Sequence, residues 1–337
     1  MRAYTVSKSA LAVALVGTMV WAGLQASADP PAPIVQAPSS AARELSQTPP
    51  PALEGMPSSD TPAQSEPAPI VTPGDTESSA EMPPDLTQTD PDLGLPGGGA
   101  SYCGPVAISN WLVHWAAHGF DRLAPPGDTL KDRQVALVHK LSSAYYMATS
   151  PFSGTGPAGV LRGLDRWVRH AGYQIDRLEY QGWRHHPRAF STGIKQPQIS
   201  WLAEAVAQGG AAWLHIGWYH HHPRYLGLRR RGGHWLTLVR IEQAGPTAEL
   251  RVRDSAPYAG DAPTLDRAVL RPLDDGWLFD HKTAFRGHGY YEVTGGLHLK
   301  HPDDIAVLDG AVVLVLNAAL PEKPRPGKPS SSPHSKN

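Results

Sequence analysis

The stretch Ser101-Tyr102-Cys103-Gly104-Pro105-Val106-Ala107-Ile108 holds the single cysteine of the 337-residue chain. From Ile108 onward, apolar residues recur at steps of three and four, which is typical of a helix that buries one face. Cys103 is therefore expected at the helix start, where unpaired backbone N–H groups and the helix dipole stabilise negative charge. A thiol placed there is favoured as the nucleophilic thiolate. The alternative is a small buried cysteine that only packs.

The N-terminus has the features of a secretory signal. Two basic residues precede an apolar run over 10–24, and Ala26-Ser27-Ala28 follows as a small-residue cleavage site. Residues 1–28 are thus predicted to be a signal peptide, and the protein to be secreted or periplasmic. No later apolar stretch is long enough to span a bilayer, so no integral membrane segment is expected after signal cleavage. A lone cysteine in an oxidising compartment cannot form an internal disulfide, so its thiol is either shielded or used.

Two segments have the composition of disordered chain. Residues 29–96 are dominated by Pro, Ala, Ser and Thr, with eleven acidic residues against a single arginine, and such a sequence buries too little apolar surface to fold. Residues 319–337 are rich in Pro, Ser and Lys. We therefore expect an acidic disordered linker over 29–96, a folded domain over 97–318, and a disordered basic tail over 319–337.

The order of helical and strand patterns indicates the fold class. Helical patterns over 108–115, 130–145 and 160–168 come first, and strand patterns dominate the rest of the domain. One further helix is expected over 199–206, and strands are expected over 173–178, 211–219, 235–241, 249–253, 289–293 and 312–316. Helices followed by strands predict an α+β fold, with an N-terminal helical half packed on a C-terminal antiparallel β-sheet.

A histidine and an aspartate lie on two strands that are expected to form a hairpin. Gly232-Gly233-His234 leads into the apolar strand that begins at Trp235, and Asp254 ends the next strand on the same face as Leu250 and Val252. Opposed residues of an antiparallel hairpin have position numbers with a constant sum. If His234 opposes Asp254, the turn is centred on Ala244, within a turn sequence. The sequence therefore predicts that His234 and Asp254 lie side by side.

These residues suggest nucleophilic catalysis by the cysteine. A histidine held by a carboxylate can take a proton from a thiol, while the carboxylate fixes the tautomer and the orientation of the ring. A structural strand histidine and a turn-capping aspartate are the alternatives for His234 and Asp254. Together with Cys103, they predict a Cys-His-Asp triad.

Three motifs resemble a known family. Cys-Gly-Pro at a helix start, Gly-Gly-His-Trp on a strand, and an aspartate ending the next strand are similar to the bacteriocin-processing, double-glycine leader peptidases and their secreted stand-alone relatives. The resemblance spans 97–318 and implies a papain-like cysteine peptidase fold, catalysis by Cys103, His234 and Asp254, a peptide or protein substrate, and no cofactor. The family has an oxyanion glutamine six residues before the cysteine, where this chain has Gly97.

Three functions stay open for such a chain. The first is a secreted cysteine peptidase that forms a thioester acyl-enzyme, and the second is an amidase or acyltransferase that uses the same triad. The third is a papain-fold binding module that has lost activity, which Gly97 makes plausible. Candidates for the missing oxyanion donor are Ser101, Gln88 and a backbone amide of the glycine run over 97–99.

Two other polar clusters do not predict a definite site. His220-His221-His222 invites a metal site, but adjacent side chains do not converge easily on one tetrahedral ion, so no metal is predicted. Arg224 and Arg229-Arg230-Arg231 precede His234 and either line the rim of a cleft for an anionic substrate or form a solvated loop. No nucleic-acid-binding motif is present in the sequence.

Overall fold

The computed structural model describes residues 82–319 apart from 223, 225, 257–264, 275, 282, 298 and 300. The predicted signal peptide, the linker up to residue 81 and the tail beyond residue 319 lie outside the described residues. The chain divides into units over 1–70 and 71–337, and everything described below belongs to the second. Within that described part, no helix has the length and apolar character needed to cross a membrane.

The predicted helices are present. They are α1 (Cys103–Ala117), α2 (Leu130–Ser142), α3 (Pro157–His170) and α4 (Ile199–Ala207). α1 begins at Cys103, as the sequence predicts. α2 begins at a capping box, in which Thr129 and Asp132 satisfy each other's backbone N–H groups. Short 3₁₀ helices cover Pro91–Leu93, Pro96–Gly99, Asp121–Leu123 and Arg188–Phe190.

Nine strands are formed by the described residues, all in one sheet. They are β1 (Tyr173–Gly182), β2 (Ala211–His221), β3 (Gly227–Ala244), β4 (Thr247–Arg253), β5 (Asp266–Pro272), β6 (Trp277–Asp280), β7 (Thr283–Arg286), β8 (Tyr291–Thr294) and β9 (Ile305–Ala319). Every strand expected from the sequence is found, but β3 and β9 extend well beyond the predicted segments, and the expected strand over 289–293 is represented by β8. β5, β6 and β7 were not predicted.

The predicted fold class is wrong, because the sheet closes on itself. β2 pairs with both β3 and β9, and the pairs β3–β4, β4–β5, β5–β8 and β8–β9 complete a ring. All six pairings are antiparallel, so these strands form a closed barrel rather than the sheet of a papain-like α+β fold. β1 is added outside β9, while β6 pairs with β3 in parallel and carries β7. Closure removes the exposed edges that an open sheet would leave unpaired.

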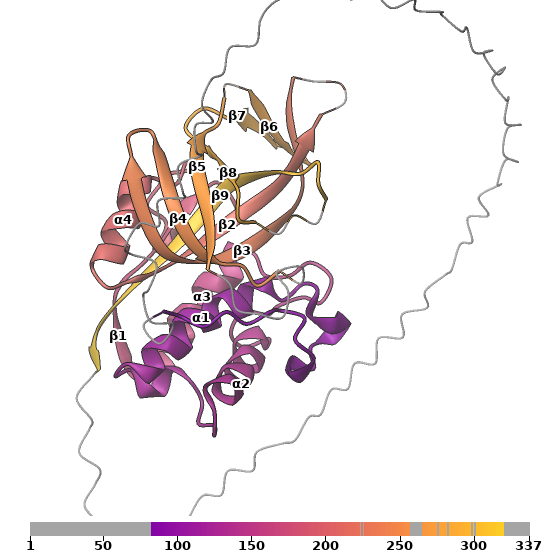
Figure 1. Ribbon diagram of the computed structural model, residues 1–337. Coiled ribbons are helices and arrows are strands. Elements are labelled where there is room, and N and C mark those ends of the chain that lie inside the picture. Colours follow the sequence, from indigo (N-terminus) through magenta and orange to yellow (C-terminus); the bar gives the residue numbers. More distant parts are fainter. Residues whose placement is uncertain are drawn as a thin grey trace, which may run out of the picture. The chain divides into compact units, whose positions relative to one another are not determined.

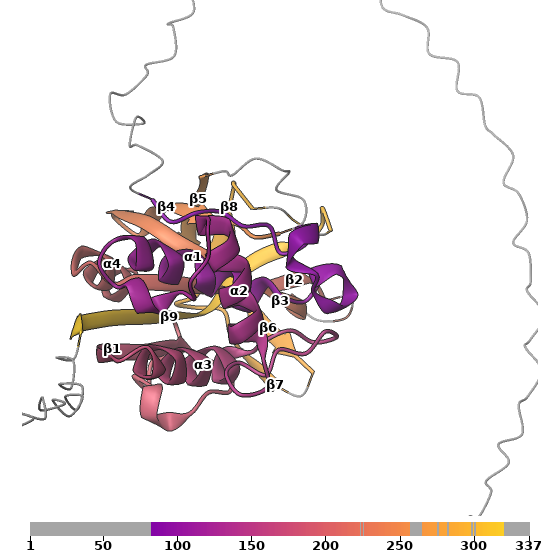
Figure 2. The same ribbon diagram turned by 90° about the horizontal axis from the view of Figure 1, so that it is seen from below.

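Two cores lie on opposite faces of the strands. Inside the barrel, every strand of the ring contributes apolar side chains, and α4 packs against them. Outside it, β1, β2, β3 and β9 bury side chains against α1 and α3, and the three N-terminal helices gather on one side of the barrel (Figures 1 and 2). Alternation along β2 explains both cores, because Ala212, Leu214 and Ile216 face inward, whereas Ala211 and Trp213 face the helices.

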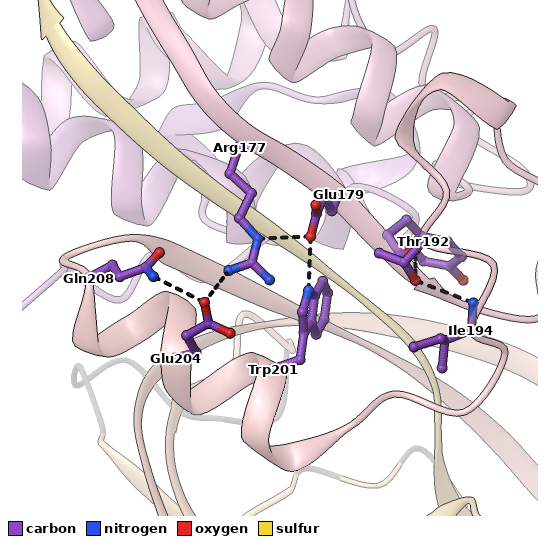
Figure 3. Close-up of polar contacts among 8 residues, drawn as sticks. Arg177, Glu179, Thr192, Ile194, Trp201, Glu204 and Gln208 are labelled. Atoms are coloured by element: carbon purple, nitrogen blue, oxygen red, sulfur yellow. Dashed lines mark hydrogen bonds and ion pairs between the residues drawn. The ribbon is translucent and has the colours of Figure 1, made fainter.

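Polar contacts connect α4 to β1 (Figure 3). Glu179 on β1 accepts hydrogen bonds from Arg177 Nε at 2.8 Å and from Trp201 Nε1 of α4 at 3.0 Å. Arg177 Nη1 also lies 3.5 Å from Glu204, which accepts a bond from Gln208. Burial raises the pKa of Glu179, but the bonds from Trp201 and Arg177 outweigh it and lower that pKa. The cluster therefore holds α4 against the strand that extends the barrel.

Residues 82–96, assigned by composition to the disordered linker, are folded onto the domain. Leu86, Leu93 and Leu95 are buried in a cluster with residues of α1 and α2. Lys131 of α2 pairs with Asp90 and Asp92, and Arg253 Nε donates to the carbonyl of Pro83 at 3.0 Å. Three widely spaced leucines in a Pro- and Asp-rich stretch have no helical or strand period, so pattern analysis misses this segment, which we call the N-terminal strap.

Candidate active site

Cys103 is positioned by the docking of α1 on the barrel. Trp213 Nε1 and Thr237 Oγ1 both donate to the carbonyl of Ala107, at 2.9 and 2.8 Å, and Trp111 Nε1 donates to the carbonyl of Leu238 at 2.8 Å. The first turn of α1 also lies very close to the loop before α3, and it contacts β3. A Cβ on Gly104 would lie 3.0 Å from Thr155 and 3.5 Å from Trp235, which gives a steric reason for glycine after the cysteine.

His234 and Asp254 are hydrogen-bonded, as the sequence predicts. His234 Nε2 donates to Asp254 Oδ1 at 2.6 Å, and Asp254 also accepts the backbone N–H of Ala256 at 3.0 Å. Both side chains are buried, and the aspartate has no exposed surface. The carboxylate in the barrel wall therefore has the partner that its burial requires.

The strand register behind this prediction is wrong. Ala244 opposes Thr247 next to the turn, and beyond a bulge Thr237 opposes Arg253, so His234 does not directly oppose Asp254. The strand also does not begin near His234, because β3 starts at Gly227. The two side chains meet diagonally, at the point where β4 ends and the chain leaves the barrel.

Cys103 lies near enough to the His234 ring to raise the pKa of that histidine. Nε2 of the ring is bonded to Asp254, so Nδ1 is the nitrogen that remains available to a thiol. Burial lowers the pKa of His234, but Asp254 and then Cys103 outweigh this effect and raise it to about 10. The arrangement thus favours an imidazolium beside the sulfur. α1 has no side-chain cap at Tyr102, so a capping side chain does not occupy the N–H groups of its first turn.

A cleft of about 520 Å³ opens beside these residues. Cys103 and His234 line it, together with the loop before α3, the start of α1, and residues of β2 and β3. Trp218 forms part of the wall and stacks on His234 with ring centroids 5.9 Å apart. Phe152 is almost fully exposed at the same cleft. A half-buried thiol next to a charged histidine is therefore open to a ligand of peptide size.

The candidates for the second oxyanion donor differ in whether they line the cleft. Gly97 is exposed and does not line the cleft, whereas Gln88 and Ser101 do. The buried Gln88 belongs to the N-terminal strap, and its backbone N–H donates to the carbonyl of Ser255, next to Asp254. Gln88 Nε2 donates to the carbonyls of Gly99 and Ala100, at 3.0 and 2.9 Å, and so holds the loop that leads to the cysteine.

The arginines and histidines noted in the sequence before His234 differ in whether they line the cleft. Arg230 and Arg231 line the cleft, whereas Arg224, Arg229 and the triplet His220–His222 do not. In the part of the chain that the structure describes, no group of three or more His, Cys, Asp or Glu side chains is arranged to hold a metal ion.

Sequence reasoning missed two buried polar residues near the site, His215 in β2 and Asp309 in β9. Each is a single titratable residue within an apolar strand, Ala211-Ala212-Trp213-Leu214-His215-Ile216 and Ile305-Ala306-Val307-Leu308-Asp309. Burying a charged group or an imidazole at such a position costs free energy unless the group has a partner. A titratable residue inside an apolar strand was therefore the sequence feature that could have identified both residues.

Comparison with known proteins identifies no relative, because no protein-family model and no curated protein matches this sequence. Its chemistry therefore has to be argued from the geometry of its own residues.

Proposed function

We propose that this protein is a cysteine peptidase, with Cys103 as the nucleophile, His234 as the acid and base, and Asp254 as the residue that orients the histidine. The observation that carries the proposal is the hydrogen bond between His234 and a buried carboxylate in the same cleft that the half-buried thiol of Cys103 lines. The likeness of the three motifs to leader peptidases supports the same activity, although the fold expected from that likeness is wrong.

The reaction follows from the charges of the three groups. The thiolate of Cys103 attacks the carbonyl carbon of a peptide bond, and His234 gives its proton to the leaving amine, so that a thioester remains. Water then attacks the thioester, His234 accepts a proton from it, and the acid product leaves with the thiol restored. The carboxylate of Asp254 stabilises the buried imidazolium of His234.

The negative charge on the carbonyl oxygen needs hydrogen-bond donors. The backbone N–H of Cys103, at the uncapped start of α1, supplies one. Gln88 is the second candidate, since its amide lies in the cleft and is held by the loop before Cys103. A shift of Gln88 from one of its two carbonyl partners would free an N–H for the oxyanion.

Cleavage of a mixed peptide library, read by mass spectrometry, tests this proposal. The protein is expected to cleave peptides, and Cys103→Ala is expected to lose the activity completely while keeping the same thermal unfolding. Met147→Leu serves as the matched control, because it alters a buried sulfur residue outside the cleft. Transfer of the acyl group to added amines without hydrolysis would replace the peptidase assignment with an acyltransferase, and undiminished cleavage by Cys103→Ala would reject the cysteine mechanism.

A further inference from the structure

A second polar centre lies in the same cleft as Cys103. Arg230 of β3 forms a buried ion pair with Asp309 of β9, with its Nε 2.6 Å from Asp309 Oδ2. Asp309 Oδ1 also accepts hydrogen bonds from Tyr219 Oη at 2.7 Å and Trp183 Nε1 at 3.0 Å. Arg230 lines the cleft and Asp309 does not, so the carboxylate holds the arginine from behind.

The barrel is built around this pair. Pairing with β2 skips Arg231 in β3 and Asp309 in β9, so each strand carries a bulge beside the pair. A Cβ on Gly233 would lie 2.3 Å from Arg230 Nη2, and a Cβ on Gly217, directly opposite, would lie 2.4 Å from Asp309 Oδ2. Bulges re-aim side chains, and here two bulges and two facing glycines make room for one guanidinium.

A buried histidine that stacks on Trp235, and that has one ring nitrogen without a hydrogen-bond partner among the described residues, lies beside the arginine. His215 of β2 is 5% exposed and lines the cleft, and its Nδ1 has no hydrogen-bond partner in the described part of the chain. His215 Nε2 and Arg230 Nη2 are both close neighbours of the position that a Cβ on Gly233 would occupy. Burial lowers the pKa of His215 well below its ordinary value, and Arg230, Arg184 and His234 lower it further. These three cations therefore disfavour a positive charge on the His215 ring, which keeps the imidazole neutral.

Other charged side chains line the cleft as well. Asp304 lies 3.1 Å from Arg231 Nε, but neither of its buried carboxylate oxygens has a hydrogen-bond partner in the described part of the chain. Arg184 is held through Nη1 by Asp280, which lies outside the lining. Arg230 lines the cleft and is held by Asp309 through its Nε, and no hydrogen bond involves its Nη atoms in the described part of the chain. The Nη edge of a guanidinium suits a carboxylate.

We propose that Arg230 and His215 form a subsite that binds a carboxylate of the substrate, in the same cleft in which Cys103 attacks the peptide bond. This inference rests on the proposed peptidase function. The carboxylate belongs either to an acidic side chain or to the free C-terminus of the peptide. Arg230 supplies a charged, forked donor, and neutral His215 supplies one N–H.

Binding to Cys103→Ala protein tests the subsite without turnover. Three pentapeptides that carry the same uncharged fluorophore on a blocked N-terminus are compared by anisotropy, with a central Glu and amidated C-terminus, a central Gln and amidated C-terminus, and a central Gln and free C-terminus. At least one carboxylate peptide is expected to bind about tenfold more tightly than the uncharged one, and the one that does identifies the source. Equal affinities, or no binding of any of the three, would overturn the proposal.

Variants in the same background locate the preference. Arg230→Lys keeps a cation next to Asp309 but loses the forked guanidinium, and it is expected to remove most of the preference for carboxylate peptides. His215→Gln leaves the ion pair between Arg230 and Asp309 intact and is expected to have the same effect. Arg229→Gln is the matched control, because Arg229 is exposed outside the cleft, and it should keep the preference. A preference that survives both subsite variants, or that Arg229→Gln abolishes equally, would contradict the assignment.

The wild-type protein separates this proposal from the peptidase function. Preferential binding by the Cys103→Ala protein, with no cleavage of any peptide by the wild type, would sustain the subsite and reject the peptidase. Cleavage of all three peptides with the same kcat/KM would sustain the peptidase and reject the subsite.

Discussion

The bond between His234 and Asp254 determines how the histidine can act. Nε2 of the ring donates to a carboxylate with no solvent exposure, so the proton on Nε2 is fixed and Nδ1 is left for the thiol. The same carboxylate stabilises the charged ring, whose pKa is raised to about 10. Asp254 thus sets both the tautomer and the charge of His234.

Replacing the carboxylate by an amide tests that dual role. Asp254→Asn keeps the shape of the side chain and can still accept the N–H of Ala256, so the protein should fold. The amide supports the wrong tautomer and no longer stabilises the imidazolium, and kcat is expected to fall roughly 10³–10⁴-fold. Steady-state kinetics of Asp254→Asn, with Asp266→Asn as a control at a carboxylate outside the cleft, provide the measurement. Unchanged kcat would exclude Asp254 from catalysis.

The raised pKa of His234 also predicts how stability depends on pH. The folded pKa of about 10 lies above the ordinary value of 6.5, so the charged ring stabilises the fold fully below pH 6.5. That contribution is lost as the pH rises towards 10. In a Cys103→Ser background, where the thiol does not titrate, the unfolding free energy lost between pH 6.5 and 10 should be larger with His234 than with His234→Gln. Parallel pH profiles would contradict the raised pKa.

At the scale of elements, the site depends on one helix docked on one strand pair. α1 brings the thiol, β3 the histidine, and side chains of β2 and β3 donate to the carbonyl of Ala107 within α1. Thr237 is central, since it donates to Ala107 and accepts from Asn110 Nδ2 at 3.1 Å. All of these groups are buried, so the bonds fix the distance between the nucleophile and its base.

Removal of the Thr237 hydroxyl should therefore affect both stability and activity. Thr237→Val keeps the volume but leaves Asn110 Nδ2 without that acceptor, and is expected to cost about 1–3 kcal/mol of unfolding free energy. It should also lower kcat more than it changes KM, because α1 is less firmly placed. Thr247→Val, in the partly exposed β3–β4 turn, is the matched control and should cost less. Denaturant titrations and kinetics measure both effects, and equal losses from the two substitutions would argue against a special role for Thr237.

At the scale of the whole molecule, the sequence predicted the helices and the pairing of His234 with Asp254 better than the topology. Apolar spacing located all four helices, although α1 is buried on nearly all sides whereas α2, α3 and α4 each keep an exposed face. Closure of the barrel depends on β5, a short strand with three charged residues that was not predicted, and on the pairing of β8 with β5 and β9, which are distant in sequence. Without β5 and these pairings, a ring cannot be told from an open sheet.

The site was predicted in part for similar reasons. Cys103, His234 and Asp254 occur at local motifs, and the hairpin brought two of them together even though a bulge changed the register. Gln88 was named as a candidate oxyanion donor, but the fold of its strap was not expected. His215 and Asp309 reach the site region through a bulge and a pairing between distant strands, which leave no local pattern. Long-range pairing therefore limits prediction here more than residue chemistry does.

The most direct test of the central claim is the labelling of Cys103 by a peptidyl electrophile, with the adduct mapped by mass spectrometry. We expect one adduct, on Cys103, that forms at neutral pH and forms about tenfold or more slowly in His234→Ala, because the imidazolium no longer stabilises the thiolate. A small alkylating agent applied to the unfolded proteins should react equally in both and serves as the control. A native thiol that does not react, or that reacts at the same rate without His234, would contradict the account.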